Sequence, residues 1–164
     1  THADAAKFTS IANLSANPRV SAVTENPCIW SVKGDGTSAS ESVLPLIALL
    51  GDRGVDGLRA MAVADGWCLV FSTKNIHDTA ELAQAVIALG FSNLRTDQSL
   101  VTVVGRSLGT TSGVVNRIRS LISGQNVELE GVVIEPNGIG FLLSESDAPA
   151  AVSTLHDNLI VSDV

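Results

Sequence analysis

The sequence predicts an α+β fold made of two ferredoxin-like units in tandem. The first observation is an internal repeat, in which Cys28–Ser72 aligns over Leu100–Ser144 without a gap, at an offset of 72 residues. The second is the order of the expected elements in each copy, which is strand, helix, strand, strand, helix, strand. The third is an Asp-Gly or Asn-Gly pair at the same place in both copies, which is typical of tight hairpins.

Each copy begins with a short expected strand, Cys28–Lys33 in the first and Leu100–Gly105 in the second. The second of these strands is rich in β-branched residues, which favour extended structure. Small and polar residues follow at Gly34–Ser40 and Arg106–Gly113. We expect both stretches to be loops that lead into a helix.

The helix after each loop is predicted from apolar residues at spacings of three and four, which place them on one helical face. These residues are Val43, Leu46, Ile47 and Leu50 in the first copy, and Val114, Ile118, Leu121 and Ile122 in the second. We expect the first helix to start near Ser42, because Pro45 is tolerated in the first turn of a helix. Both helices are expected to end at glycine-containing turns, Gly51–Gly54 and Ser123–Asn126.

Two strands joined by a hairpin follow each of these helices. They are expected over Val55–Val63 and Trp67–Ser72 in the first copy, and over Val127–Glu135 and Ile139–Ser144 in the second. The connections contain Asp65-Gly66 and Asn137-Gly138, which tolerate the positive φ angles of a hairpin turn. Each pair of strands is therefore expected to be antiparallel.

A second helix and a short edge strand complete each copy. The helices are expected over Asp78–Leu89 and Asp147–Asn158, and the edge strands near Asn93–Thr96 and Leu159–Ser162. The predicted boundaries are therefore 1–18 for an N-terminal tail or linker, 19–98 for the first unit and 99–164 for the second. We also expect a short helix such as Asp4–Leu14 in the tail and an added strand at Arg19–Thr24.

Composition excludes several classes of protein. The chain has 164 residues, with ten Lys and Arg against seventeen Asp and Glu, which gives a formal charge of −7. This charge disfavours nucleic-acid binding, which needs a basic surface. No apolar run approaches the ~20 residues that a membrane-spanning helix needs. We therefore expect a soluble, cytoplasmic protein with neither nucleic-acid nor membrane partners.

The sequence contains no recognisable catalytic motif, because the G-x-S-x-G pattern and the glycine-rich phosphate loops are both missing. The two cysteines, Cys28 and Cys68, are too few for a disulfide framework and have no histidine at metal-ligand spacing. We predict no catalytic residue, no bound metal and no cofactor.

Three segments carry a pattern beyond the repeat itself. Ala88–Leu108 contains Leu-Gly-Phe at the end of a predicted helix and Val-Val-Gly in the strand that follows, and Ser112–Val115 leads on to Gln125–Glu128. Ala150–Leu159 is a predicted helical segment that contains Leu155-His156. These segments resemble the tandem ACT-domain regulatory region of aspartate kinase (aspartokinase). The resemblance covers roughly Arg19 to the C-terminus and is stronger in the second unit.

The resemblance implies a non-catalytic regulatory module that senses a free amino acid, lysine or threonine, and feeds back on aspartate-family biosynthesis. It also implies a homodimer that works with an aspartate kinase catalytic domain. That domain's Lys-Phe-Gly-Gly type motif does not occur in this sequence, so we expect a regulatory fragment or a free-standing regulatory chain. The alternative is a degenerate ACT pair that serves only for dimerisation or assembly.

The candidate ligand-binding residues lie in the loop after the first strand of each unit, where small residues and a helix N-terminus favour a carboxylate. They are Gly34, Asp35, Gly36 and Thr37 in the first unit, and Ser107, Gly109, Thr110 and Thr111 in the second. The family resemblance implies a second wall at the start of the second strand of a facing unit, here Gly54–Asp56 in the first unit and Asn126, Val127 and Glu128 in the second. Asp35 and Glu128 are the expected partners of an ammonium group.

Overall fold

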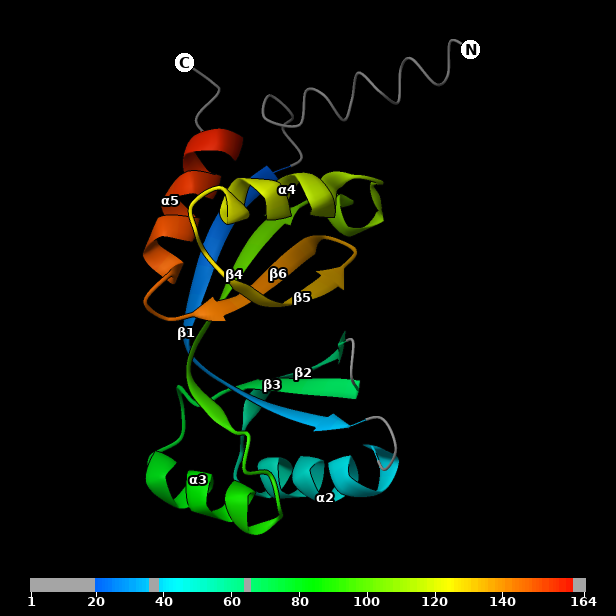
Figure 1. Ribbon diagram of the computed structural model, residues 1–164, viewed down its shortest axis with the longest axis vertical. Helices are drawn as coiled ribbons and strands as arrows, with labels where there is room; N and C mark the ends of the chain where they lie inside the picture. The colour runs from blue at the N-terminus through cyan, green and yellow to red at the C-terminus, as the bar shows by residue number, and fades with distance from the viewer. Residues whose placement is uncertain (1–19, 36–38, 64–65, 161–164) are drawn as a thin grey trace. The chain divides into compact units, whose positions relative to one another are not determined.

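The chain forms two compact units that share two strands (Figure 1). The computed structural model describes residues 20–35, 39–63 and 66–160. Residues 26–99 make up what we call the first unit, and residues 20–25 together with residues from 100 onward make up the second. The tail helix predicted at Asp4–Leu14 lies outside the described residues.

The first unit contains one complete split βαβ arrangement. Its elements are the later part of β1 (Val20–Asp35), α2 (Ala39–Asp52), β2 (Asp56–Val63), β3 (Gly66–Ser72), α3 (Thr79–Ala88) and the first part of β4 (Arg95–Gly105). The strand order is β2-β3-β1-β4, and β3 pairs antiparallel with both β1 and β2. Helices α2 and α3 pack on one face of these strands. This is the strand order of a ferredoxin-like unit.

The second unit repeats the arrangement, but its fourth strand comes from the first part of β1 and not from the end of the unit. It contains the later part of β4, the short helix η2 (Leu108–Thr110), α4 (Val114–Ser123), β5 (Leu129–Glu135), β6 (Gly138–Ser144) and α5 (Ala148–Leu159). The strand order is β1-β4-β6-β5. Helices α4 and α5 share one apolar core with these strands. The predicted fold class, α+β with two ferredoxin-like units, is confirmed.

Residues 20–25 of β1 occupy the edge beside β4 where the last strand of the second unit was expected. Val20 is buried in the core of that unit, and the Ser21 hydroxyl donates to the Val104 carbonyl at 3.1 Å. Of the closing strand predicted near Leu159–Ser162, Leu159 is instead the last residue of α5 and Ile160 is its cap, while Val161 and Ser162 lie outside the described residues. The expected strands Arg19–Thr24 and Cys28–Lys33 are thus parts of a single strand that passes from one unit to the other.

The gapless alignment of the two copies is wrong in the first strand. An offset of 72 places Val101 over Ile29, and Val103 over Ser31. In the structure, however, Val101 and Val103 contact the helices of their unit, and the matching positions in the first unit are Trp30 and Val32. Side chains alternate between the faces of a strand, so the two first strands are out of step by an odd number of residues. The helices that follow keep the offset of 72, so the loops between the first strand and the first helix differ in length between the two units.

Helix α2 begins earlier than predicted. It starts at Ala39 rather than near Ser42, so Pro45 lies inside the helix instead of in its first turn. Proline has no N–H, so one backbone hydrogen bond of the helix is lost there. Leu46 and Leu50 are nonetheless fully buried against the sheet, as the spacing predicts. Ile47, which was predicted on the same face, is instead exposed. The helix ends at Asp52, and Gly54 in the turn that follows has the left-handed φ of +68° expected for a glycine cap.

The two helices that follow the hairpins differ in how they begin, which gives a matched test of capping. The carboxylate of Asp78 accepts a hydrogen bond of 3.0 Å from the Glu81 N–H at the start of α3, whereas Asp147 before α5 makes no such bond. Replacing Asp78 by alanine is therefore expected to lower the free energy of unfolding by about 1 kcal/mol. Replacing Asp147 by alanine is expected to change it by less than about 0.5 kcal/mol. Urea denaturation of both variants measures the difference, and equal losses would contradict this assignment.

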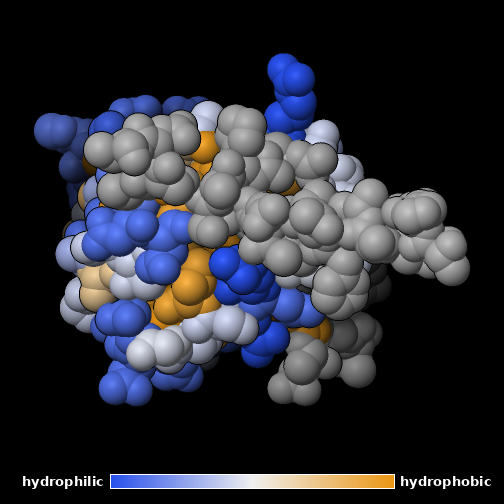
Figure 2. Space-filling view, turned by 90° about the horizontal axis from the view of Figure 1, so that it is seen from above, coloured by the Kyte–Doolittle hydropathy of each residue, from blue (hydrophilic) through white to orange (hydrophobic). Residues whose placement is uncertain are grey.

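The surface carries scattered apolar side chains among hydrophilic ones, as the face in Figure 2 shows. The exposed large hydrophobic residues are Leu44, Ile47, Leu58, Ile87, Leu89 and Ile134. Among the described residues, no helix is long and apolar enough to span a bilayer.

Candidate ligand-binding loops

The loop after β4 is fastened to the β5–β6 hairpin. Ser107 adopts a left-handed φ of 58°, and its N–H donates to the side-chain oxygen of Asn137 at 3.1 Å. The N–H of Gly109 donates to the Pro136 carbonyl at 3.3 Å, and that of Gly105 to the Asn137 carbonyl at 3.0 Å. The hairpin turn that the sequence predicts therefore also serves as the platform for the candidate loop.

The polar groups of this loop also bind one another. The hydroxyl groups of Thr110 and Thr111 both donate to the Ser107 carbonyl, at 3.1 and 2.7 Å. The backbone N–H groups of the same threonines donate to the carbonyls of Ser107 and Leu108. The structure thus brings together the four predicted residues of this loop, but it uses their backbone N–H groups inside the unit. Those N–H groups are not free to hold a carboxylate in this conformation.

Gly109 is required here because of a close backbone approach. A Cβ atom at this position would lie 1.9 Å from the Glu135 carbonyl oxygen, a distance that no real contact allows. Helix α4 begins just beyond the loop, with Gly113 as its N-terminal cap at a φ of 82° and with no side-chain capping bond. Thr111 does not cap this helix, because its hydroxyl group donates to the Ser107 carbonyl instead.

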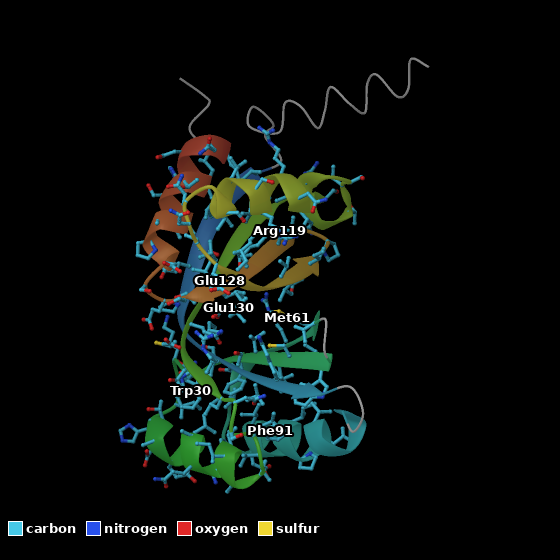
Figure 3. The ribbon with its side chains drawn as sticks, viewed as in Figure 1. Trp30, Met61, Phe91, Arg119, Glu128 and Glu130 are labelled. Atoms are coloured by element: carbon cyan, nitrogen blue, oxygen red, sulfur yellow. The ribbon has the colours of Figure 1, made fainter. Side chains whose placement is uncertain are left out.

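The predicted second wall lies at the far end of the same unit. Asn126 has a left-handed φ of 57° in the turn after α4, Val127 is buried, and Glu128 is exposed just before β5 (Figure 3). At a rise of about 3.3 Å per residue, β5 separates Glu128 from Glu135 by roughly 20 Å. Within the second unit, the loop and the start of β5 therefore do not meet.

The corresponding loop of the first unit starts at the end of β1. Gly34 and Asp35 are the last residues of that strand, and Gly36 and Thr37 lie outside the described residues. Gly34 pairs with Trp67 on β3, and a Cβ atom on Gly34 would lie 2.2 Å from the Trp67 ring. The indole covers the glycine and also makes an edge contact with Phe91, with 5.9 Å between ring centroids.

A cavity of about 320 Å³ opens on the first unit, between the end of α2 and the start of α3. Its lining residues are Arg53, Asn75, Ile76, His77, Asp78, Glu81 and Leu82. Arg53 forms an ion pair with Glu81, and this bond raises the pKa of the guanidinium above its ordinary value. The Asn75 amide donates to the Asp56 carboxylate at 3.3 Å. Arg53 and Glu81 thus already form an ion pair, and Asp78 already caps α3.

Sequence reasoning missed Arg53 and Asn75 as neighbours of the candidate regions. Asn75 approaches the start of β2 through a tertiary contact with Asp56, and Arg53 pairs with the distant Glu81, so no local pattern indicates either interaction. No cluster of three potential metal ligands occurs among residues 20–35, 39–63 and 66–160.

Comparison with known proteins gives structural matches only, because no family model and no curated protein matches the sequence. The regulatory subunit of aspartate kinase from Thermus thermophilus, in its ligand-free form, is similar with a TM-score of 0.64 and 16% identity. The match covers 85% of this chain and 97% of that subunit. The chain has the fold of an aspartate kinase regulatory region.

Complete kinases contain the same regulatory-region fold. Clostridium acetobutylicum aspartate kinase matches with a TM-score of 0.70 and 15% identity, over 87% of this chain and 35% of the kinase. E. coli aspartokinase III in complex with lysine and aspartate matches with a TM-score of 0.63 and 16% identity, over 87% of this chain and 34% of that one. The chain thus spans about a third of each of these kinases, and identities this low establish the fold alone.

Proposed function

We propose that this chain is an amino-acid-sensing regulatory module of aspartate kinase, with lysine or threonine as its effector. The observation that supports this most is the match to a regulatory subunit over nearly the full length of both chains. The lysine complex of the E. coli enzyme supports an amino acid as the ligand. We further propose that the module works as a cytoplasmic homodimer with a kinase catalytic domain.

The first unit's loop is the better candidate for the ligand's carboxylate, because the second unit's loop already uses its N–H groups. The proposed residues are Gly34, Asp35, Gly36 and Thr37, with Ser107, Gly109, Thr110 and Thr111 shaping the equivalent region of the second unit. Asn126, Val127 and Glu128 supply the facing wall, in which the exposed Glu128 carboxylate attracts the ligand's ammonium group.

An effector changes the activity of a kinase only to the extent that it prefers one conformation, typically by about 1–3 kcal/mol. We propose that the amino acid bridges two units and so favours one arrangement over another. In each unit, the loop after the first strand and the start of the second strand lie at opposite ends. A ligand that uses both features therefore contacts two units at once.

Isothermal titration of the chain with L-lysine and with L-threonine tests the proposal. We expect saturable heat with one of the two amino acids. Replacing Glu128 by glutamine is expected to weaken this binding roughly tenfold, because a charge-assisted hydrogen bond becomes a neutral one. Glu145→Gln is the matched control, because Glu145 is also exposed, in the turn between β6 and α5. Flat traces with both amino acids at millimolar concentration would reject the sensing role.

Assembly without ligand binding is the second candidate. It is favoured by the exposed apolar residues Leu44 and Ile47 on α2, and Ile87 and Leu89 at the end of α3. A dimer whose mass in light scattering and whose melting temperature do not respond to amino acids would favour this function over sensing.

A further inference from the structure

Helix α2 is apolar on both of its sides. Leu46 and Leu50 pack into the core of the first unit. Leu44 and Ile47 lie outside that core and are 63% and 38% exposed, and the next residue, Ala48, is exposed as well. A surface helix ordinarily has polar residues opposite its buried stripe, and a helix that is apolar all round is usually covered on both sides. The fold of the unit covers only one side of α2.

Helix α3 ends in a second group of exposed apolar residues. Ile87, in its last turn, is 52% exposed, and Leu89, its C-terminal cap, is 43% exposed. Helices α2 and α3 run antiparallel, because they follow β1 and β3, which are antiparallel to each other (Figure 1). The ion pair between Arg53 and Glu81 joins the end of α2 to the start of α3. The first half of α2, with Leu44, therefore lies at the same end of the helix layer as the end of α3.

The second unit has polar residues where these apolar ones stand. At the offset of 72, the exposed residues Asn116 and Arg119 of α4 take the places of the two large exposed residues of α2. The exposed residues in the last two turns of α5 are polar too, namely Ser153, His156, Asp157 and Asn158. The two helix layers thus share one fold and differ in the chemistry of their outer surface. Because the fold does not require an apolar outer surface, the one on the first unit points to a partner.

Charge limits which partner fits this surface. The chain has a formal charge of −7, and a net charge far from zero keeps copies of a protein apart. Residues 42–51 and 82–94 contain no charged residue, so the repulsion between two copies is weakest at this surface. The helix layer of the second unit would instead place Arg119 and Asp157 against apolar side chains, which costs free energy of desolvation. Of the two described helix layers, only the same layer of another copy therefore matches this one.

We propose that the helix layer of the first unit packs against the same layer of a second copy of this chain. The contact residues are Leu44, Ile47 and Ala48 of α2 together with Ile87 and Leu89 of α3. A surface that pairs with itself closes around a two-fold axis, so the assembly stops at two copies. This inference rests on the homodimer in the proposed function and assigns its interface, which needs no bound amino acid.

The size of the helix layer limits the strength of this contact. The 14 residues of α2 span about 21 Å, and two neighbouring helices are together about 20 Å wide. The footprint of the layer is therefore roughly 400 Å² on each copy, below the about 800 Å² that each partner buries in a standard specific interface. We expect a reversible dimer that dissociates on dilution.

Analytical ultracentrifugation of the full chain over a range of concentrations tests this interface. Ile87→Asp and Ile134→Asp are a matched pair, because the two isoleucines are 52% and 56% exposed and only Ile87 lies in the proposed contact. Ile134 lies on β5 of the second unit. We expect Ile87→Asp to raise the dissociation constant of the dimer roughly tenfold or more, because each copy then brings a carboxylate into an apolar contact. Ile134→Asp is expected to dimerise as the wild type does.

The outcomes separate this interface from the proposed function. If Ile87→Asp dimerises as well as the wild type, another surface joins the copies, so the inference is overturned and the homodimer stands. If the wild type is monomeric at every concentration, both fail, while saturable binding of an amino acid would still support the sensing role. NMR of the wild type with labelled isoleucine methyl groups needs no variant. We expect the Ile47 and Ile87 signals to shift with protein concentration while the Ile134 signal stays in place, and a shift at Ile134 alone would overturn the inference.

Discussion

Replacing Gly109 by alanine is expected to lower the free energy of unfolding by about 3 kcal/mol, which is at the upper end of the usual cost of inserting extra atoms into a packed region. The added Cβ atom would stand 1.9 Å from the Glu135 carbonyl oxygen and 2.8 Å from its carbon. Both are backbone atoms at the end of β5, so no side-chain rotation relieves the clash. Either the loop or the hairpin has to move, and the hydrogen bond from Gly109 to Pro136 is lost.

Gly124→Ala is the matched control for this experiment. Gly124 ends α4 in the same unit with a φ of −63°, and an added Cβ atom would have its nearest neighbour at 3.5 Å, an ordinary contact. Alanine is therefore expected to be neutral there or to stabilise by about 0.5 kcal/mol. Urea unfolding of the two variants checks the pair. A Gly109→Ala protein as stable as the wild type would show that the loop does not rest on the hairpin.

Replacing Phe71 by alanine is expected to cost about 3–5 kcal/mol, as for other large-to-small changes in cores. Phe71 is fully buried on β3, and its ring meets Trp30 edge to face with 6.3 Å between centroids. The substitution leaves a cavity beneath α2 and α3 and removes an aromatic pair worth about 0.5–1.5 kcal/mol. Because Trp30 loses its ring partner, tryptophan fluorescence is expected to report the change together with urea unfolding.

Leu58→Ala provides the comparison for Phe71→Ala. Leu58 lies on the neighbouring strand β2 and is 40% exposed, so its truncation is expected to cost less than about 1 kcal/mol. A loss for Phe71→Ala no larger than that for Leu58→Ala would contradict the assignment of Phe71 to the core of the first unit.

The candidate site could be predicted only in part. The sequence indicates the loops after the first strands because glycine, serine and threonine gather there. It does not show that Thr110 and Thr111 turn their hydroxyl groups to Ser107, because that depends on the left-handed backbone of Ser107. Nor does any local pattern indicate that Trp67 lies across from Gly34, since 33 residues separate them in the sequence.

The amino-acid sequence by itself determined the repeat, the order of helices and strands, and the buried faces of helices such as the one that carries Leu46 and Leu50. These features follow from local periodicity and turn chemistry, which act over a few residues. Only the tertiary structure decided that residues 20–25 complete the second unit, that Gly109 lies against Glu135 and that the Trp67 N–H is left without an acceptor. Each of these depends on which distant segments pack together, because pairing between strands is settled by shared burial and hydrogen bonding.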